Sequence, residues 1–567
     1  MTQPSDPAAD KGPTAPPVAK RSPHSYTHHG ITVEDPYHWL KDEGYPDVTD
    51  PEVLDYLSAE NAYFEAVMAP HQGLIDELFE EIKNRQPPED ASVPYRDGGY
   101  WYQWRFEKDA QYRIWLRAAV LPDDGEFPTI AEERWQIMLN EPELAAEHEY
   151  FTLGGLSVSR NGRYLAWSAD TSGAERFILN ITDLDSGVLL DEPIEATLGS
   201  PVWAADHEHL FYVVLNDNWR PFEVRRHKLG EPLIRDKVVY TEAEESFFVG
   251  LDETQSETYV LISTGDHVTS EVRYFEAATP NAEPQLIAPR HHGHEYDADH
   301  REGRFYIRSN RQHKNFALFS APDTDPSETN WQELLPGTDA RYLMGHLCFK
   351  NYLITSERVE GLDQVGIRSY DSDQHHYVEF PEAAYSAHGG SNPQYDSKVL
   401  RLHYESMVTP DTVFDYDIEQ RTLTTRKVQK IPTGYEAVEY ATERLFATAR
   451  DGVRVPVSVV YRKGLAKDGT APLYLYGYGA YGHAIPPGFS TSRLSLLNRG
   501  FAFAIAHIRG GDDLGYAWYE DGKLDKRTNT FNDFIDVAQF LIEQGFSSPG
   551  RVVISGGSAG GELMGCL

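Results

Sequence analysis

Cysteine is nearly absent from this sequence, with only Cys348 and Cys566 among 567 residues. Two cysteines cannot build a framework of several disulfides, and these two form no C-x-x-C spacing. No run of 18 apolar residues occurs, so no transmembrane helix is expected. Residues 1–24 lack the apolar central stretch of a secretory signal. These absences favour a reduced compartment and predict a cytoplasmic protein whose residues 1–24 form a disordered tail.

Basic residues are scarce relative to acidic ones. The chain has 51 Lys and Arg against 89 Asp and Glu, which gives a formal net charge of −38. A nucleic-acid binder needs a basic face, so we expect no nucleic-acid partner and no membrane partner. A negative field speeds the approach of a cationic substrate. The alternative interpretation is that the negative charge keeps the protein soluble, or adapts it to life at high salt.

Sequence motifs for bound cofactors and metals are also missing. No G-x-x-x-x-G-K-[ST] phosphate loop and no H-E-x-x-H zinc motif occurs, and the glycine-rich segments do not follow the pattern of a dinucleotide site. We therefore predict no cofactor and no metal. One acidic and histidine-rich segment lacks zinc spacing and is predicted to be a polar loop. Its residues are His291, His292, His294, Glu295, Asp297, Asp299 and His300.

The length of the chain predicts two or more domains, because 567 residues exceed what one core usually holds. Near the N-terminus, apolar residues at helical spacing predict helices over 51–68 and 72–84. The second helix is expected to stop before Pro87 and Pro88. We assign residues 25–86 to a first structured segment.

Paired strand-like runs joined by short polar turns then recur seven times. The pairs begin at residues 100, 164, 210, 259, 305, 352 and 399, and five of the six intervals fall between 46 and 49 residues. Hairpins repeated at this period are typical of propeller blades. We therefore predict an all-β, seven-bladed propeller over residues 87–430. The alternative is a β-sandwich with irregular hairpins.

The pattern changes again after residue 430. A hairpin is expected around Asp451 and Gly452, and short apolar strands are expected over 473–476, 501–507 and 552–555. An amphipathic helix is expected over 529–543, between the last two of these strands. Strands that alternate with helices indicate a parallel α/β sheet, so residues 431–567 are predicted to form an α/β domain.

The strongest local motif is Gly556-Gly557-Ser558-Ala559-Gly560. It fits the G-x-S-x-G nucleophile elbow, with a predicted strand before it and a predicted helix after it. The turn is so tight that the positions flanking the serine require glycine, because side chains there would collide with the strand and the helix. Ser558 is thereby exposed at the sheet edge as a nucleophile, and the N–H of Ala559 points toward an oxyanion. The alternative is a glycine-rich turn with an idle serine.

Two further loops are expected at the same sheet edge. Tyr478 follows the strand 473–476 and is our choice for a second oxyanion donor, although these tyrosines can also simply pack. The segment RGGDDLG at 509–515 follows the next strand. It is a possible substrate loop containing Arg509, with Asp512 and Asp513 placed to receive a cationic group. The alternative is a solvated turn without a role.

These motifs resemble the prolyl oligopeptidase family of serine peptidases, and most closely its oligopeptidase B branch. The resemblance extends from about residue 25 to the last residue. In the α/β domain it is carried by ARDGVRVPVSVVY at 449–461, YGYG at 476–479, SRLSLLNRGF at 492–501, RGGDDLG at 509–515, WYEDGK at 518–523, NTFNDFID at 529–536 and GGSAGG at 556–561. Elsewhere it is carried by DPYHWL at 35–40, SEVRYFEA at 270–277, RFYIRSNRQHKNFALF at 304–319 and TPDTVFDYD at 409–417.

The resemblance implies an α/β-hydrolase domain, made from 25–86 and 431–567, together with a seven-bladed propeller that excludes folded proteins. It implies hydrolysis of short peptides after Arg or Lys through an acyl-serine. Ser558 would be the nucleophile, and Tyr478 with the N–H of Ala559 would form the oxyanion hole.

Two features depart from the family pattern. In this fold the triad Asp and His follow the serine, yet only nine residues follow Ser558. We therefore expect the hydrolase domain to be incomplete, the sequence to be a fragment, and this chain alone to be inactive. Oligopeptidase B members often carry acidic residues in the stretch 485–489, where this chain has Pro486 and Gly488. This puts a preference for dibasic pairs in doubt.

Two other interpretations stay open. A prolyl oligopeptidase would cleave after Pro instead of Arg or Lys. A chain that truly ends at Leu567 would be a propeller with half a hydrolase, acting as a peptide-binding or decayed scaffold.

Overall fold

The computed structural model describes residues 15–44, 48–125, 127–372, 374–382 and 384–567. The first 14 residues of the predicted tail lie outside these ranges. The chain divides into two units, Met1–Arg85 and Gln86–Leu567. Within the described ranges, no helix has the length and apolar character needed to cross a membrane.

The described residues of the first unit form one hairpin and two long helices. The hairpin is β1 (Ser25–His28) with β2 (Ile31–Glu34), and the helices are α1 (Pro51–Met68) and α2 (Gln72–Asn84). Asp50 caps α1, because its side chain accepts a hydrogen bond from the N–H of Glu52, and proline at the first helical position needs no partner. Both helices have the predicted bounds.

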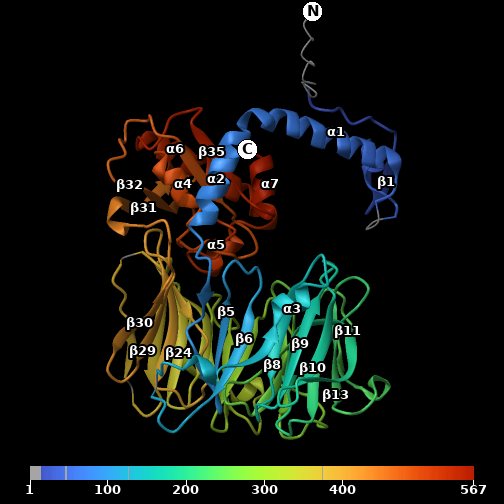
Figure 1. Cartoon of the computed structure of the whole chain (residues 1–567). Coiled ribbons are helices and arrows are strands. Elements are labelled where there is room, and N and C mark those ends of the chain that lie inside the picture. Colours follow the sequence, from blue (N-terminus) through green and yellow to red (C-terminus); the bar gives the residue numbers. More distant parts are fainter. Residues whose placement is uncertain (1–14, 45–47, 126, 373, 383) are drawn as a thin grey trace, which may run out of the picture. The chain divides into compact units, whose positions relative to one another are not determined.

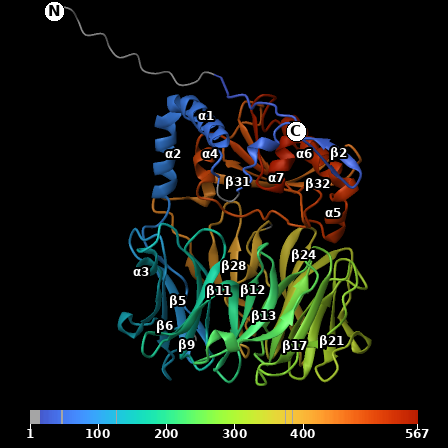
Figure 2. The ribbon, with the colours of Figure 1, turned by 90° about the vertical axis from the view of Figure 1, so that its right-hand side faces the viewer.

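The residues from 86 to 430 form sheets of antiparallel strands that stand side by side (Figures 1 and 2). The first sheet has five strands, β3 (Asp90–Ala91), β4 (Tyr95–Asp97), β5 (Tyr100–Phe106), β6 (Ile114–Ala119) and β7 (Gln136–Asn140), followed by α3 (Glu141–Ala145). The second has seven, β8 (Thr152–Val158), β9 (Tyr164–Asp170), β10 (Phe177–Asp183), β11 (Val188–Trp203), β12 (His209–Leu215), β13 (Pro221–Lys228) and β14 (Lys237–Thr241).

Four sheets of four strands complete this region. One consists of β15 (Phe248–Glu253), β16 (Tyr259–Gly265), β17 (Ser270–Glu276) and β18 (Gln285–Leu286). The next consists of β19 (Tyr296–Arg301), β20 (Arg304–Ser309), β21 (Ala317–Pro322) and β22 (Gln332–Leu335). The other two are β23 (Arg341–Cys348), β24 (Tyr352–Val359), β25 (Leu362–Ser369) and β26 (His375–Tyr377), and β27 (Ser386–Gly389), β28 (Val399–Glu405), β29 (Thr412–Asp417) and β30 (Thr422–Val428).

The predicted count of seven separate blades is wrong. The described residues between 86 and 430 give six sheets. The difference comes from β11, a continuous strand of 16 residues. Its first part pairs with β10 and its last part pairs with β12, so the second and third predicted hairpins share one seven-stranded sheet. A regular hairpin period does not reveal such a shared strand.

Apolar side chains between neighbouring sheets form the cores of this region. Phe305 of β20 and Phe319 of β21 are 0% and 2% exposed, and they pack with Tyr259 of β16 and Tyr274 of β17 from the preceding sheet. Burying one such side chain stabilises the fold by about 1.5–3 kcal/mol. Each sheet therefore needs a neighbour on its face, which explains the stacked arrangement.

A five-stranded sheet forms the core of the C-terminal region, in the order β31-β32-β34-β33-β35. The strands are β31 (Tyr440–Thr448), β32 (Arg454–Arg462), β33 (Leu473–Gly477), β34 (Ala502–Ala506) and β35 (Val552–Ser555). β33 runs parallel to β34 and β35, as predicted, and β31 and β32 form the predicted hairpin. The helices are α4 (Arg493–Asn498), α5 (Tyr516–Glu520), α6 (Arg527–Glu543) and α7 (Ala559–Gly565).

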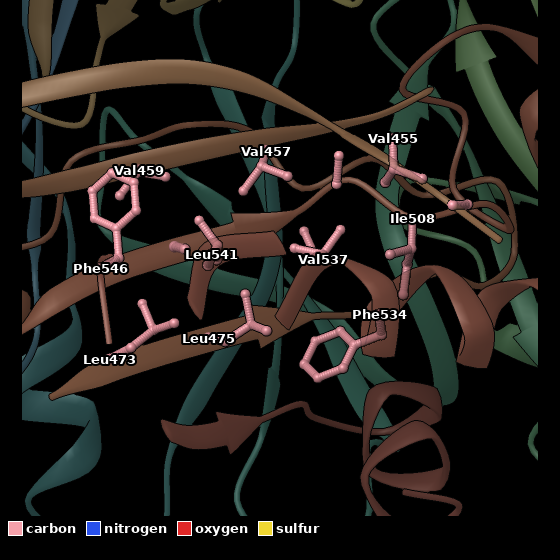
Figure 3. Packing of buried hydrophobic residues seen from close by; sticks show 14 of the residues in the cluster. Val455, Val457, Val459, Leu473, Leu475, Ile508, Phe534, Val537, Leu541 and Phe546 are labelled. Atoms are coloured by element: carbon pink, nitrogen blue, oxygen red, sulfur yellow. The ribbon is translucent and has the colours of Figure 1, made fainter. Parts of the chain in front are cut away.

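Helix α6 covers this sheet with one apolar face. Phe534, Val537 and Leu541 follow the spacing i, i+3, i+7 and are 0–1% exposed. They lie among side chains of β32 and β33, such as Val457 and Leu475 (Figure 3). The helix predicted over 529–543 thus exists as α6, Arg527–Glu543.

Candidate active site

Ser558 lies in a sharp turn between β35 and α7. Its backbone dihedrals are φ 54° and ψ −119°, a combination that a residue with a side chain rarely adopts. The turn continues directly into the helix, because the N–H of Gly561 donates to the carbonyl of Ser558 at 2.8 Å. The predicted strand–turn–helix context of the serine is therefore observed.

The glycines on both sides of Ser558 are required by close backbone contacts. A Cβ atom at Gly556 would lie 2.4 Å from the carbonyl oxygen of Gly560. A Cβ atom at Gly560 would lie 2.8 Å from the carbonyl oxygen of Gly477, which ends strand β33. Both distances are too short for carbon and oxygen. Two of the three motif glycines therefore allow the elbow to sit against the end of β33.

The serine side chain and the amide after it are both available. Ser558 is exposed, and no hydrogen bond within the described ranges uses its Oγ or the N–H of Ala559. Such an N–H beside an exposed hydroxyl is the arrangement in which a backbone donor meets an oxyanion.

Tyr478 follows β33 on the same sheet edge as Ser558. Tyr476 of β33 lies opposite Ser555 of β35 in the parallel register, so the residues after both strands meet at one edge. Tyr478 is half-buried, and a Cβ atom at Gly560 would lie 3.5 Å from its ring. The ring of Tyr478 also packs edge-on against His483, at 5.7 Å between centroids. The structure thus brings Tyr478 next to the turn that holds Ser558.

Arg509 is buried in a network of ion pairs. Its Nε and Nη2 atoms donate to the two carboxylate oxygens of Asp533 on α6, at 2.8 and 2.6 Å, and its Nη1 lies 2.7 Å from an oxygen of Asp451. Arg509 and Asp533 are 4% and 0% exposed. The hydrogen bonds that Arg509 donates to Asp533 raise the pKa of Arg509, and burial raises the pKa of Asp533. Arg509 therefore joins the loop to helix α6.

Asp512 and Asp513 also have partners. Asp512 Oδ1 accepts a hydrogen bond from Nη1 of Arg358 on β24, at 2.7 Å. Asp513 Oδ1 lies 2.9 Å from Nδ1 of His507. Burial raises the pKa of Asp512 even though Arg358 lowers it. Both carboxylates are thus engaged by side chains of the protein itself.

Sequence reasoning missed His507, because its partners Asp513 and Ser458 are brought to it only by the fold. Its Nε2 lies 2.8 Å from Oγ of Ser458, which completes an Asp–His–Ser chain of the kind found in serine hydrolases. However, Ser458 and His507 are only 7% and 8% exposed, and the adjoining cavity measures about 30 Å³. That volume holds about one water molecule. This chain of hydrogen bonds is therefore a buried structural contact between β32 and the loop after β34.

A larger cavity, of about 360 Å³, lies beside Ala559. This volume falls in the range of sites for small molecules. Its walls come from the loops after β16 and β33, from α5, from the segment between α5 and α6, and from the first turns of α6 and α7. The lining residues are His267, Val268, Ala480, Tyr481, Tyr519, Gly522, Lys523, Leu524, Arg527, Ala559 and Glu562.

Two histidines of the segment 291–300 are hydrogen-bonded to residues other than Ser558. His294 Nε2 is hydrogen-bonded to Ser309 and His300 Nδ1 to Ser256, both at 2.8 Å. Burial lowers the pKa of His294 to about 4, which keeps its ring neutral. Across the part of the chain that the structure describes, no three His, Cys, Asp or Glu residues are grouped to hold a metal ion.

Comparisons with known protein families cover most of the chain. The model of the prolyl oligopeptidase N-terminal beta-propeller domain matches residues 16–429, and the model of the prolyl oligopeptidase family matches residues 487–567. The chain is 37% identical to dipeptidyl aminopeptidase BI of Pseudoxanthomonas mexicana, over 100% of this chain and 79% of that protein. It is 33% identical to Protease 2 of Moraxella lacunata, over 97% of this chain and 78% of that protein.

Solved structures of similar fold include two oligopeptidases B. The enzyme from Leishmania major superposes with a TM-score of 0.91 at 29% identity, covering 98% of this chain and 80% of that one. The enzyme from Trypanosoma brucei, with covalently bound antipain, superposes with a TM-score of 0.90 at 28% identity, covering 97% and 80%.

Proposed function

Because this chain belongs to the prolyl oligopeptidase family of serine peptidases, we propose that it hydrolyses short peptides on the carboxyl side of Arg or Lys. The observation that carries the proposal is Ser558, an exposed hydroxyl on a strained turn whose next amide is free to bind an oxyanion. Strained backbone of this kind is concentrated at functional sites.

The proposed reaction is acyl transfer. Oγ of Ser558 attacks the carbonyl carbon of the scissile bond while a base takes its proton, and the negative oxygen is bound by the N–H of Ala559 and the hydroxyl of Tyr478. The C–N bond then breaks, the leaving amine takes the proton, and water hydrolyses the acyl-serine. In this class the base is a histidine, which follows the serine in the chain order of the fold. No described histidine is hydrogen-bonded to Ser558.

The charge of the chain supports a basic substrate, whereas the loop 509–515 is assigned a structural role. A net charge of −38 favours the approach of a basic peptide. We assign Arg509, Asp512 and Asp513 to holding the loop at the sheet edge, because each has a side-chain partner. The scarcity of cysteine supports a cytoplasmic location as part of the same proposal.

Amide reporters test the specificity. The protein produced from its own gene should release the fluorophore from peptides ending in Arg or Lys at least about tenfold faster than from peptides ending in Pro, as expected for a charged recognition contact. The Ser558→Ala variant should release none above background. Preferential cleavage after Pro would contradict the basic specificity, and undiminished cleavage by Ser558→Ala would contradict the site.

Removal of dipeptides from a free amino end is a second candidate function. It is favoured by the 37% identity to a protein named dipeptidyl aminopeptidase BI. A dipeptide reporter ending in Arg, with its amino group free or acetylated, separates the two. A dipeptidyl aminopeptidase needs the free amino group, whereas an endopeptidase accepts the acetylated reporter.

A further inference from the structure

The cavity beside Ala559 is basic, although the chain as a whole is strongly acidic. Lys523, Arg527 and His267 line it, and Glu562 is the only acidic residue along its wall of described residues. Glu562 lies 2.7 Å from Nη2 of Arg527, so its charge is already matched. A basic cavity in a protein of net charge −38 indicates that the cavity receives an anionic group.

Lys523 is the cation in this cavity that has no acidic partner. Within the described part of the chain, its Nζ makes no ion pair and no hydrogen bond. It lies 4.1 Å from the ring centroid of Tyr519, so an aromatic face holds the ammonium group at the cavity wall. The nearby carboxylate of Glu295 attracts Lys523, but its Oε1 already accepts a hydrogen bond from Tyr516 at 2.8 Å. The ammonium group of Lys523 therefore has N–H donors available to a ligand.

The other two basic residues are less available. Arg527 donates to Glu562 and to the carbonyl of Gly479, so most of its guanidinium is engaged. His267 is exposed, and its ring stacks on Tyr481 at 5.6 Å between centroids. Arg527 and His267 therefore form part of the cavity wall, and Lys523 supplies the positive charge that is available to a ligand.

We propose that Lys523 binds the C-terminal α-carboxylate of the peptide substrate. This inference rests on the proposed function, in which the scissile carbonyl oxygen is bound by the N–H of Ala559. The α-carboxylate lies on the leaving-group side of that carbonyl. Since a peptide extends about 3.3–3.6 Å per residue, a carboxylate that binds in a cavity bordered by Ala559 leaves only a short leaving segment. Lys523 would thus select cleavage close to the C-terminus of short peptides.

Binding to the Ser558→Ala variant tests this without requiring turnover. Three peptides of equal length are titrated by calorimetry: one with a free C-terminal carboxylate, one with a C-terminal amide, and one amide with Asp as its last residue. We expect the free acid to bind about tenfold more tightly than the plain amide, as for a charge-assisted hydrogen bond. Adding Lys523→Met should reduce that ratio to about one, and Lys523→Arg should restore part of it.

Lys526→Met is the matched control. Lys526 lies three residues away, does not line the cavity, and pairs with Asp521 at 2.6 Å, so its loss should leave the tenfold ratio unchanged. Equal binding of acid and amide, absence of any binding, or a ratio that persists in Lys523→Met would overturn the inference. So would a preference for the Asp amide over the free acid, because the site would then read an acidic side chain. Cleavage of the reporters is measured separately, so the proposed function can stand when this inference fails.

Discussion

Two glycine-rich loops follow β34 and β35, the strands on either side of β33 in the C-terminal sheet, and their polar side chains are engaged in opposite ways. In the loop 509–515 after β34, Arg509 and Asp512 each pair with an oppositely charged side chain, and Asp513 contacts Nδ1 of His507. In the turn 556–560 after β35, Ser558 is exposed, has positive φ and makes no hydrogen bond through Oγ within the described ranges.

The difference shows how a reactive group can be told from a structural one. Charges that are buried and paired hold a loop in place, and removing one leaves its partner without compensation. A polar group that is held in a strained conformation without a partner does not stabilise the fold, so its conformation indicates a role in the reaction. The first loop should therefore respond to mutation by losing stability, and the second by losing activity.

The largest effect is expected for Ser558→Ala in the protein produced from its gene. Loss of the nucleophile should lower kcat/KM for an Arg-ended reporter by at least about 10⁴-fold. The melting temperature should stay within about a degree of the wild type, since the exposed hydroxyl makes no contact that stabilises the fold. A large fall in melting temperature would show that Ser558 is a structural residue like those of the other loop.

Asp533→Ala should act on stability. It leaves the buried guanidinium of Arg509 without its main partner, and should lower the free energy of unfolding by about 3–5 kcal/mol. Chemical denaturation measures the change. The matched control is Asp536→Ala on the same helix, whose partner Arg450 is half exposed, and which should cost about 1 kcal/mol. Equal effects of the two changes would refute the distinction between buried and exposed pairs.

Tyr478→Phe tests the oxyanion donor. Removing one such hydroxyl should lower kcat by about 10²–10³-fold with little change in KM, because the bond forms mainly in the transition state. Tyr476→Phe, two residues earlier in β33, is the control and should leave kcat almost unchanged. A loss confined to KM would assign Tyr478 to substrate binding.

Asp512→Asn should change how stability depends on pH. Burial raises the pKa of Asp512 above the 3.8 of the unfolded chain, so between these two values the native state holds a proton that unfolding releases. This residue's contribution to stability therefore falls as the pH rises through that window. The wild type should therefore lose stability relative to the variant as the pH rises above 3.8, and chemical denaturation at a series of pH values measures the loss. A difference that is constant with pH would contradict the raised pKa.

Local patterns predicted much of the fold. Apolar spacing gave helices α1 and α2 with the observed bounds, and strand pairing in the propeller followed from hairpins of regular spacing. The elbow could be predicted because its requirements are local: a strand, a serine, small neighbours and a helix. Tyr478 could be placed at the same edge because the strands are parallel.

Long-range pairing could not be predicted in this way. Arg358 and Asp512 are 154 residues apart, and Arg509 meets Asp533 only after helix α6 has packed. Nothing near Asp512 or Asp513 in the sequence distinguishes a carboxylate that awaits a substrate from one that already has a partner. The shared strand β11 escaped prediction for a related reason, since its two halves pair with different strands.

The central claim is that Ser558 is the nucleophile of a serine peptidase, and covalent labelling tests it most directly. The protein produced from its gene is treated with a fluorophosphonate, which transfers its phosphorus to an activated serine oxygen and releases fluoride. Peptide mapping by mass spectrometry then locates the adduct. We expect a single adduct on Ser558 that rises in step with the loss of Arg-reporter cleavage. An active protein whose adduct lies on another residue would contradict the assignment.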